Sequence, residues 1–170
     1  METLVALGVL GVLSVLVFVG VESYLSKAAR VTCLGNLKNL GAAFHLYLND
    51  HEDRWPPYPD NLDSFSKEFE DYWMNLFQSK YQIPPKTWIC PALKKANLKS
   101  PDGRVLNLHY APSFFDHAKG RAMNLNMDGK KHPWIIEIAD AHGDGALMYF
   151  PNSGVVSMNQ FLRDHGIPTN

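Results

Sequence analysis

An uncharged apolar run near the start of the chain constrains its fold more than any other feature. From Thr3 to Val21 no residue carries a charge, and only small or hydroxyl residues interrupt the run. These roughly 19 residues would form about 28 Å of α-helix, enough to cross the hydrocarbon core of a membrane. The charged residue that precedes the run is an acid, Glu2, whereas membrane anchors normally begin with lysine or arginine. The basic residues Lys27 and Arg30 follow the run instead.

The same helix is predicted to continue well beyond the apolar run. No proline occurs over residues 22–50, and apolar residues recur at three- and four-residue steps, the spacing of one helix face. This stripe consists of Cys33, Leu37, Leu40, Phe44 and Leu48. We predict one helix over about 3–49, which ends before the proline-rich segment 55–59 because proline cannot continue a helix. Residues 1–22 would be a membrane or filament-core half, and residues 23–50 an amphipathic half packed on the rest of the protein.

Residues 51–170 are predicted to form one small globular α+β head. Aromatic residues at helical steps over 63–81 indicate a short amphipathic helix that covers a sheet. We predict strands at 86–91, 105–111, 134–139, 146–150 and 154–158, with a hairpin loop at 151–154. Residues 112–131 read as loop, and 159–170 as one short helical turn with a frayed end. A long helix followed by an antiparallel sheet gives the α+β class.

The charge and the motifs argue against several classes of function. The formal net charge is −1 and the isoelectric point about 6.6, so there is no electrostatic footprint for nucleic acid. The sequence has no HExxH, GxSxG or P-loop pattern, and its seven histidines are scattered. We therefore expect neither nucleic-acid binding nor an enzyme.

Several short motifs of this chain resemble those of one family. The stretch Glu2–Leu7 is similar to the start of the type IV pilins and type II secretion pseudopilins, in which a glutamate lies near the beginning of a hydrophobic helix. A more particular resemblance, to a bacterial pseudopilin-like subfamily, lies in LSKAAR at 25–30, Cys33, NLKNLG at 36–41 and Tyr47. Shorter echoes are Cys90-Pro91 and the segment from His142 to Val156.

This resemblance implies a pilin-like fold, in which a long helix packs on a small antiparallel β-sheet head. It also implies a structural subunit of a type IV pilus-like filament or a type II secretion pseudopilus, with methylation at the amino terminus. The implied partners are identical or related pilin subunits, an inner-membrane assembly platform and a prepilin peptidase. The implied location is a single pass in the cytoplasmic membrane with an extracytoplasmic head, and later an extracellular or periplasmic filament. No basic leader precedes Met1, so we expect a chain already processed or one that begins at an internal methionine.

The assembly residues that follow from this resemblance lie at the start of the helix. A carboxylate beside an apolar helix is costly to bury unless it is neutral or paired, and an N-terminal amine on a neighbouring helix is the natural partner of Glu2. Alternatively, Glu2 lies at the water interface and stabilises the helix N-terminus. We assign Glu2 and Thr3 to assembly, together with Gly8 and Gly11, which would let neighbouring helices approach closely.

The two cysteines, Cys33 and Cys90, form no CxxC pair, which argues against a structural zinc site. In an exported protein they could form one disulfide that ties the helix to the head. They could equally be two buried thiols, a common environment for cysteine. The sequence leaves both readings open, because spacing does not fix geometry.

One acid–histidine cluster, Asp140, His142 and Asp144, lies between two predicted strands. A calcium loop would use these residues, but calcium takes six to eight oxygens and the residues do not form an EF-hand. We favour a Gly- and Asp-rich turn without metal or cofactor. Two rival functions remain: a single-pass anchored module that binds a wall sugar or peptide and forms no filament, and an anchored enzyme that uses His142 with Asp140 or Asp144.

Overall fold

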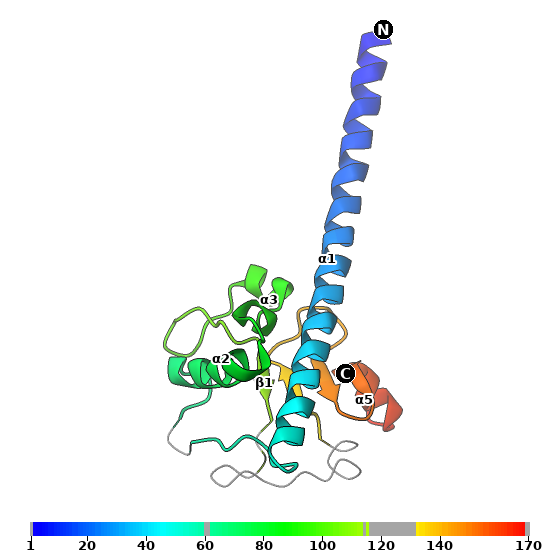
Figure 1. Cartoon of the computed structure of the whole chain (residues 1–170). Helices are drawn as coiled ribbons and strands as arrows, with labels where there is room; N and C mark the ends of the chain where they lie inside the picture. Colours follow the sequence, from blue (N-terminus) through cyan, green and yellow to red (C-terminus); the bar gives the residue numbers. More distant parts are fainter. Residues whose placement is uncertain (1, 60–61, 114, 116–131, 169–170) are drawn as a thin grey trace.

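The protein has an α+β fold in which one long N-terminal helix extends beyond a globular head (Figure 1). A computed structural model describes residues 2–59, 62–113, 115 and 132–168, and side chains are described for residue 14 and from residue 21 onward. Helix α1 spans Glu2–Asp50, close to the predicted 3–49. Its C-terminal half lies against the head, whereas its N-terminal half extends away from it (Figure 1).

The predicted apolar stripe of α1 faces the head. Cys33, Leu37, Leu40 and Phe44 are fully buried and Leu48 is 2% exposed. Directly after the helix, a backbone hydrogen bond from Asp53 N–H to Leu48 C=O (2.8 Å) turns the chain. The part of the amphipathic half from Cys33 to Leu48 therefore contributes to the core, whereas residues 23–28 of the predicted half do not pack on the head as predicted.

Further towards the N-terminus, α1 leaves the head. Residues 21–28 are all exposed, including Tyr24 at 72% and Leu25 at 59%. The predicted membrane or core half, residues 1–22, consists almost wholly of positions whose side chains lie outside the described part. In the part that is described, no helix combines the length and apolar character needed to cross a membrane.

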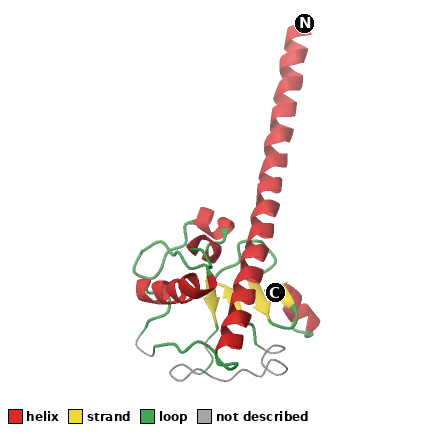
Figure 2. Ribbon diagram, in the orientation of Figure 1, coloured by secondary structure: helices red, strands yellow, loops and turns green. Residues whose placement is uncertain are grey.

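The sheet of the head has four antiparallel strands in the order β1-β2-β3-β4. They are β1 (Tyr110–Pro112), β2 (Ile135–Glu137), β3 (Leu147–Phe150) and β4 (Gly154–Ser157). The last three match the strands predicted at 134–139, 146–150 and 154–158, and residues 151–153 form the predicted turn between β3 and β4. Helix α1 contacts β2, β3 and β4, and Figure 2 shows the sheet beside its lower half.

One predicted strand was wrong, and another was right only at its C-terminal end. Residues 86–91 instead form a 3₁₀ turn, η1 (Pro85–Trp88), and the start of α3 (Pro91–Ala96), because Pro85 and Pro91 occupy first-turn helix positions that suit proline. In the segment predicted as a strand at 105–111, strand structure starts only at Tyr110. Its earlier backbone groups pair outside the sheet, since Leu106 N–H donates to Leu98 C=O (3.0 Å) and His109 N–H to Trp88 C=O (2.8 Å).

The predicted amphipathic helix is α2 (Lys67–Tyr81), which starts four residues later than the predicted range because Ser66 caps it by accepting a hydrogen bond from Phe69 N–H (3.1 Å). Phe69, Trp73 and Phe77 on its inner face are at most 1% exposed, as expected for core residues. The ring of Phe44 in α1 lies 4.4 Å from that of Phe77, centroid to centroid. The two helices thus share one aromatic core.

The C-terminal segment forms more helix than the single turn predicted. Helix α5 covers Met158–Asp164, and Ser157 caps it by accepting a hydrogen bond from Gln160 N–H (3.2 Å). Phe161 stacks on Phe150 of β3, with ring centroids 5.2 Å apart. Most of the loop predicted at 112–131 lies outside the described residues.

Candidate functional site

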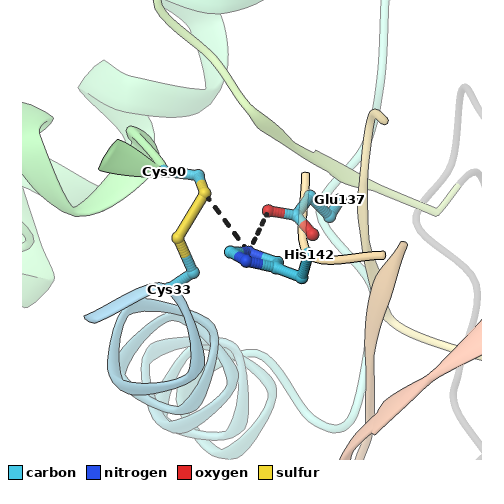
Figure 3. Close-up of side chains that lie close together, drawn as sticks. All are labelled: Cys33, Cys90, Glu137 and His142. Carbon is cyan, nitrogen blue, oxygen red and sulfur yellow. Dashed lines mark hydrogen bonds and ion pairs between the residues drawn. A yellow bond between two sulfur atoms is a disulfide. The ribbon is translucent and has the colours of Figure 1, made fainter. Parts of the chain in front are cut away.

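A disulfide joins α1 to the head. Cys33 of α1 is bonded to Cys90, 57 residues later in the chain, and both side chains are fully buried. Of the two readings that the sequence left open, the structure has the bridged one (Figure 3). The bond lies at the first fully buried residue in the described part of α1 and fixes the helix covalently to the head at that point.

Hydrogen bonds hold the segment around Cys90 in place. The residue caps α3, its carbonyl accepts a hydrogen bond from Lys94 N–H (2.9 Å), and its own N–H donates to His109 Nδ1 (3.1 Å). From α1, Asn36 Nδ2 donates to the carbonyl of Ile89 (3.0 Å). The Cys90 sulfur is thus positioned by α1, α3 and the strand that follows His109.

Two buried titratable side chains lie against the disulfide (Figure 3). Glu137 is the last residue of β2, and His142 lies in the loop between β2 and β3; their side chains are 0% and 1% exposed. His142 Nε2 lies 3.4 Å from Glu137 Oε1 and 3.6 Å from Cys90 Sγ. The other oxygen, Glu137 Oε2, accepts a hydrogen bond from Leu147 N–H (3.2 Å) on β3.

Burial determines the charge state of this pair. Loss of solvation raises the pKa of Glu137 to about 7, against the opposing hydrogen bond from Leu147 N–H. Burial also lowers the pKa of His142, and the nearby positive charge of Arg30 lowers it further. The 3.4 Å contact with His142 is an ion-pair distance, and Glu137 Oε1 is a buried oxygen with no hydrogen-bond partner among the described residues. Such an oxygen costs free energy unless a proton or a cation satisfies it.

Four side chains with metal-binding atoms therefore converge here. The two sulfurs, His142 Nε2 and a carboxylate oxygen of Glu137 all lie within 4.8 Å of one another. Among the residues that the structure describes, this is the one such group. The sequence argument against zinc considered only CxxC spacing, and it did not consider a cluster assembled from three separate segments: the one around Cys33, the one around Cys90, and residues 137–142. One signal was available, because Glu137 occupies an inward position of the otherwise apolar strand segment WIIEIA.

The predicted acid–histidine cluster does not act as one unit. Both carboxylate oxygens of Asp140 accept backbone hydrogen bonds, from His142 and Gly143 (2.9 and 2.8 Å) and from Gly145 (3.1 Å), as in a Gly- and Asp-rich turn. Asp144 accepts a hydrogen bond from the Ser157 hydroxyl (2.7 Å). The His142 ring points instead toward Glu137 and Cys90 (Figure 3). The three residues of the predicted calcium loop thus have separate partners.

Asp144 makes two longer ion pairs with basic residues. Its carboxylate lies 3.6 Å from Arg30 on α1 and 3.7 Å from Arg163 on α5. The surrounding hydrogen bond and positive charges lower its pKa. Asp144 therefore links α1, β4 and α5. Its negative charge lies between the positive charges of Arg30 and Arg163.

The predicted assembly residues lie in the projecting half of α1. Glu2 and Thr3 are in its first turn, and Gly8 and Gly11 follow along the same helix. Their side-chain environment lies outside the described part. Comparison of the chain with protein-family models, with curated proteins and with solved structures gave no match.

Proposed function

We propose that the protein is a structural subunit of a pilus-like or pseudopilus filament, held in a membrane by its N-terminal helix before assembly. The observation that carries this proposal is the projection of α1 beyond the head (Figure 1). At 1.5 Å per residue, residues 2–28 extend about 40 Å. A single helix of this length, whose described residues 21–28 are all exposed, is suited to packing against other helices.

Exposed apolar side chains on α1 support an associative role. Val21, Tyr24, Leu25 and Val31 are 49–72% exposed, on a helix that buries one face of its C-terminal part in the core. Water contact with such a row is unfavourable, and burial against neighbouring helices or lipid removes it. In a filament the same helices from many subunits would supply that cover.

The junction of helix and head is suited to bearing load. Cys33–Cys90 bonds α1 covalently to the head, and Arg30 of α1 pairs with Asp144 of the head one helical turn before the bridge. A force applied to the projecting half would reach the head through this junction, because residues 21–28 are exposed and the covalent bond lies just beyond them. A mechanical subunit needs such a connection, whereas a simple membrane tether does not.

The resemblance described above assigns an assembly role to Glu2. A carboxylate carried into an apolar helix bundle needs a positive partner, and the N-terminal amine of an adjacent subunit would supply one. Gly8 and Gly11 would allow neighbouring helices to approach closely. Each position lies in the half of α1 that extends from the head.

The test is filament formation in cells that express the full chain. Glu2→Ala should leave the protein in the membrane fraction but sharply reduce the number of filaments counted by negative-stain electron microscopy. The control is Glu68→Ala, which removes an exposed acid from α2 of the head and should leave filament numbers unchanged. Wild-type filament numbers in Glu2→Ala would contradict the assembly role. A wild-type chain that forms no filaments, but retains specific sugar or peptide, would favour the anchored binding module.

A further inference from the structure

We propose that the reduced form of the Cys33–Cys90 pair binds one zinc ion, with the two sulfurs, His142 Nε2 and Glu137 Oε1 as its four ligands. The oxidised protein would hold a disulfide at this place, and the reduced protein a metal. The same four side chains would thus join α1 to the head in either redox state. This inference stands apart from filament assembly and does not depend on it.

The ligand types are those of zinc proteins. Zinc takes cysteine thiolate, histidine nitrogen and carboxylate oxygen, with four ligands in a tetrahedron, and soft thiolates favour it over calcium or magnesium. The described part of the chain offers these donors together only in this cluster. The cysteines supply two ligands, so the site does not need the missing CxxC motif.

The distances already in place fit a tetrahedral ion. With metal–sulfur bonds of about 2.3 Å and metal–nitrogen and metal–oxygen bonds of about 2.1 Å, a tetrahedron holds sulfur and nitrogen about 3.6 Å apart, and nitrogen and oxygen about 3.4 Å apart. The structure places Cys90 Sγ 3.6 Å from His142 Nε2, and His142 Nε2 3.4 Å from Glu137 Oε1. The two bonded sulfurs are too close for this geometry, and reduction of their bond frees them to separate.

Glu137 gives an independent reason to expect a cation. Its Oε1 is fully buried, faces His142, and lacks a hydrogen-bond donor, whereas its Oε2 is held by Leu147 N–H. A buried carboxylate oxygen without a donor is unfavourable, and a metal ion at the centre of the cluster would satisfy it. The His142 ring presents its Nε2 to the same centre and is carried on the turn that Asp140 fixes.

The redox step requires a two-electron reductant, such as a dithiol or a phosphine. The reductant breaks the sulfur–sulfur bond, and two electrons and two protons convert the disulfide to two thiols. Zinc then displaces both thiol protons and binds the two thiolates. A surface cleft of about 480 Å³ is lined by Pro91 and Ala141, which are chain neighbours of Cys90 and His142.

The experiment is a metal titration of the full chain, purified and reduced with a phosphine under anaerobic conditions. Co²⁺ is the optical probe, because tetrahedral thiolate ligation gives it characteristic charge-transfer and d–d bands, and Zn²⁺ should displace it. Reduced wild-type protein should bind one ion per chain with these bands, and oxidised protein none. Bound Zn²⁺ should also slow re-formation of the disulfide by a mild oxidant.

Variants separate a built site from adventitious binding. Glu137→Gln and His142→Gln should each weaken zinc binding by more than the roughly 10–100-fold that loss of an outer hydrogen-bond partner costs. The matched controls are Glu68→Gln and His165→Gln, both at exposed positions outside the cluster, and they should bind like the wild type. Circular dichroism of each oxidised variant verifies that its fold is intact.

Three results would overturn the proposal. One is wild-type affinity in either Glu137→Gln or His142→Gln. Another is metal binding by reduced protein that equals binding by a Cys33→Ser/Cys90→Ser double variant. The last is a reduced chain that unfolds and that zinc does not refold.

Discussion

Reduction of the Cys33–Cys90 bond should lower the stability of the head substantially. The two cysteines are 57 residues apart, and closing a loop of that length in the unfolded chain is worth about 4 kcal/mol in the chain-entropy treatment. Poor packing of the freed thiols should add little to this loss of stability. Both are fully buried, and His142 Nε2 lies 3.6 Å from Cys90 Sγ, within reach of a thiol hydrogen bond.

The expected change is large enough for a simple thermal assay. For a chain of this size, 1 kcal/mol corresponds to roughly 2–4 °C in melting temperature, so reduction should lower the melting temperature by roughly 8–16 °C. The full chain is heated with and without a phosphine, in a metal chelator so that no ion replaces the bond. A Cys33→Ala/Cys90→Ala variant serves as the control, since the phosphine should leave its melting temperature unchanged. Oxidised and reduced wild-type proteins that melt within about 2 °C of each other would refute the loop-closure reasoning.

Three further predictions follow from packing and burial. Gly41→Ala should destabilise the protein by about 1–3 kcal/mol in denaturant unfolding, because the new Cβ would lie 2.2 Å from the buried Tyr149 ring. The control is Gly35→Ala, which has open space around the new Cβ and should be neutral or stabilising by up to about 1 kcal/mol. In the oxidised protein with chelator, the raised pKa of Glu137 contributes stability that is fully present below its ordinary pKa of 4.5 and is lost as pH rises through about 7. The total loss is about 3 kcal/mol, and Glu137→Gln should abolish this pH dependence. A pH profile of stability in that variant equal to that of the wild type would contradict this reasoning. A fragment beginning at Val31 keeps the buried stripe of α1 and should be soluble and melt cooperatively, and a heat scan without a transition would count against this boundary.

Helices α1 and α2 and the C-terminal strands were predictable because their signals are local. The 3.6-residue stripe from Cys33 to Leu48 is long enough to define both the helix and its buried face. The β3–β4 hairpin likewise follows from two short apolar runs separated by Pro151, Asn152 and Ser153. In each case the residues that form the element also carry the pattern.

The segment before Cys90 shows where local pattern fails. Trp88, Ile89 and Cys90 have the composition of a buried strand, and two of the three are fully buried. Yet Pro85 and Pro91 favour helical turns on either side, and the backbone of Trp88 pairs with His109 and not with the sheet. The side chains correctly predicted that this segment is buried. Its backbone conformation, however, is set by the two prolines and by the hydrogen bond to His109, which lies 21 residues after Trp88.

The residues of one short motif have two different roles in the buried cluster: the aspartates shape the loop, and the histidine faces the cluster. In the run Asp140 to Asp144, the two aspartates bind backbone amides, a serine hydroxyl and arginines, which shapes the loop and fastens it to α1 and α5. That shape turns His142 inward, where it meets Glu137 and the sulfurs. The sequence alone identifies the motif but suggests one site made of its acids and its histidine. It does not show which of these side chains are already hydrogen-bonded to backbone amides. The donors that converge on His142 come from α1, the α3 cap and β2, so only the assembled head could reveal them.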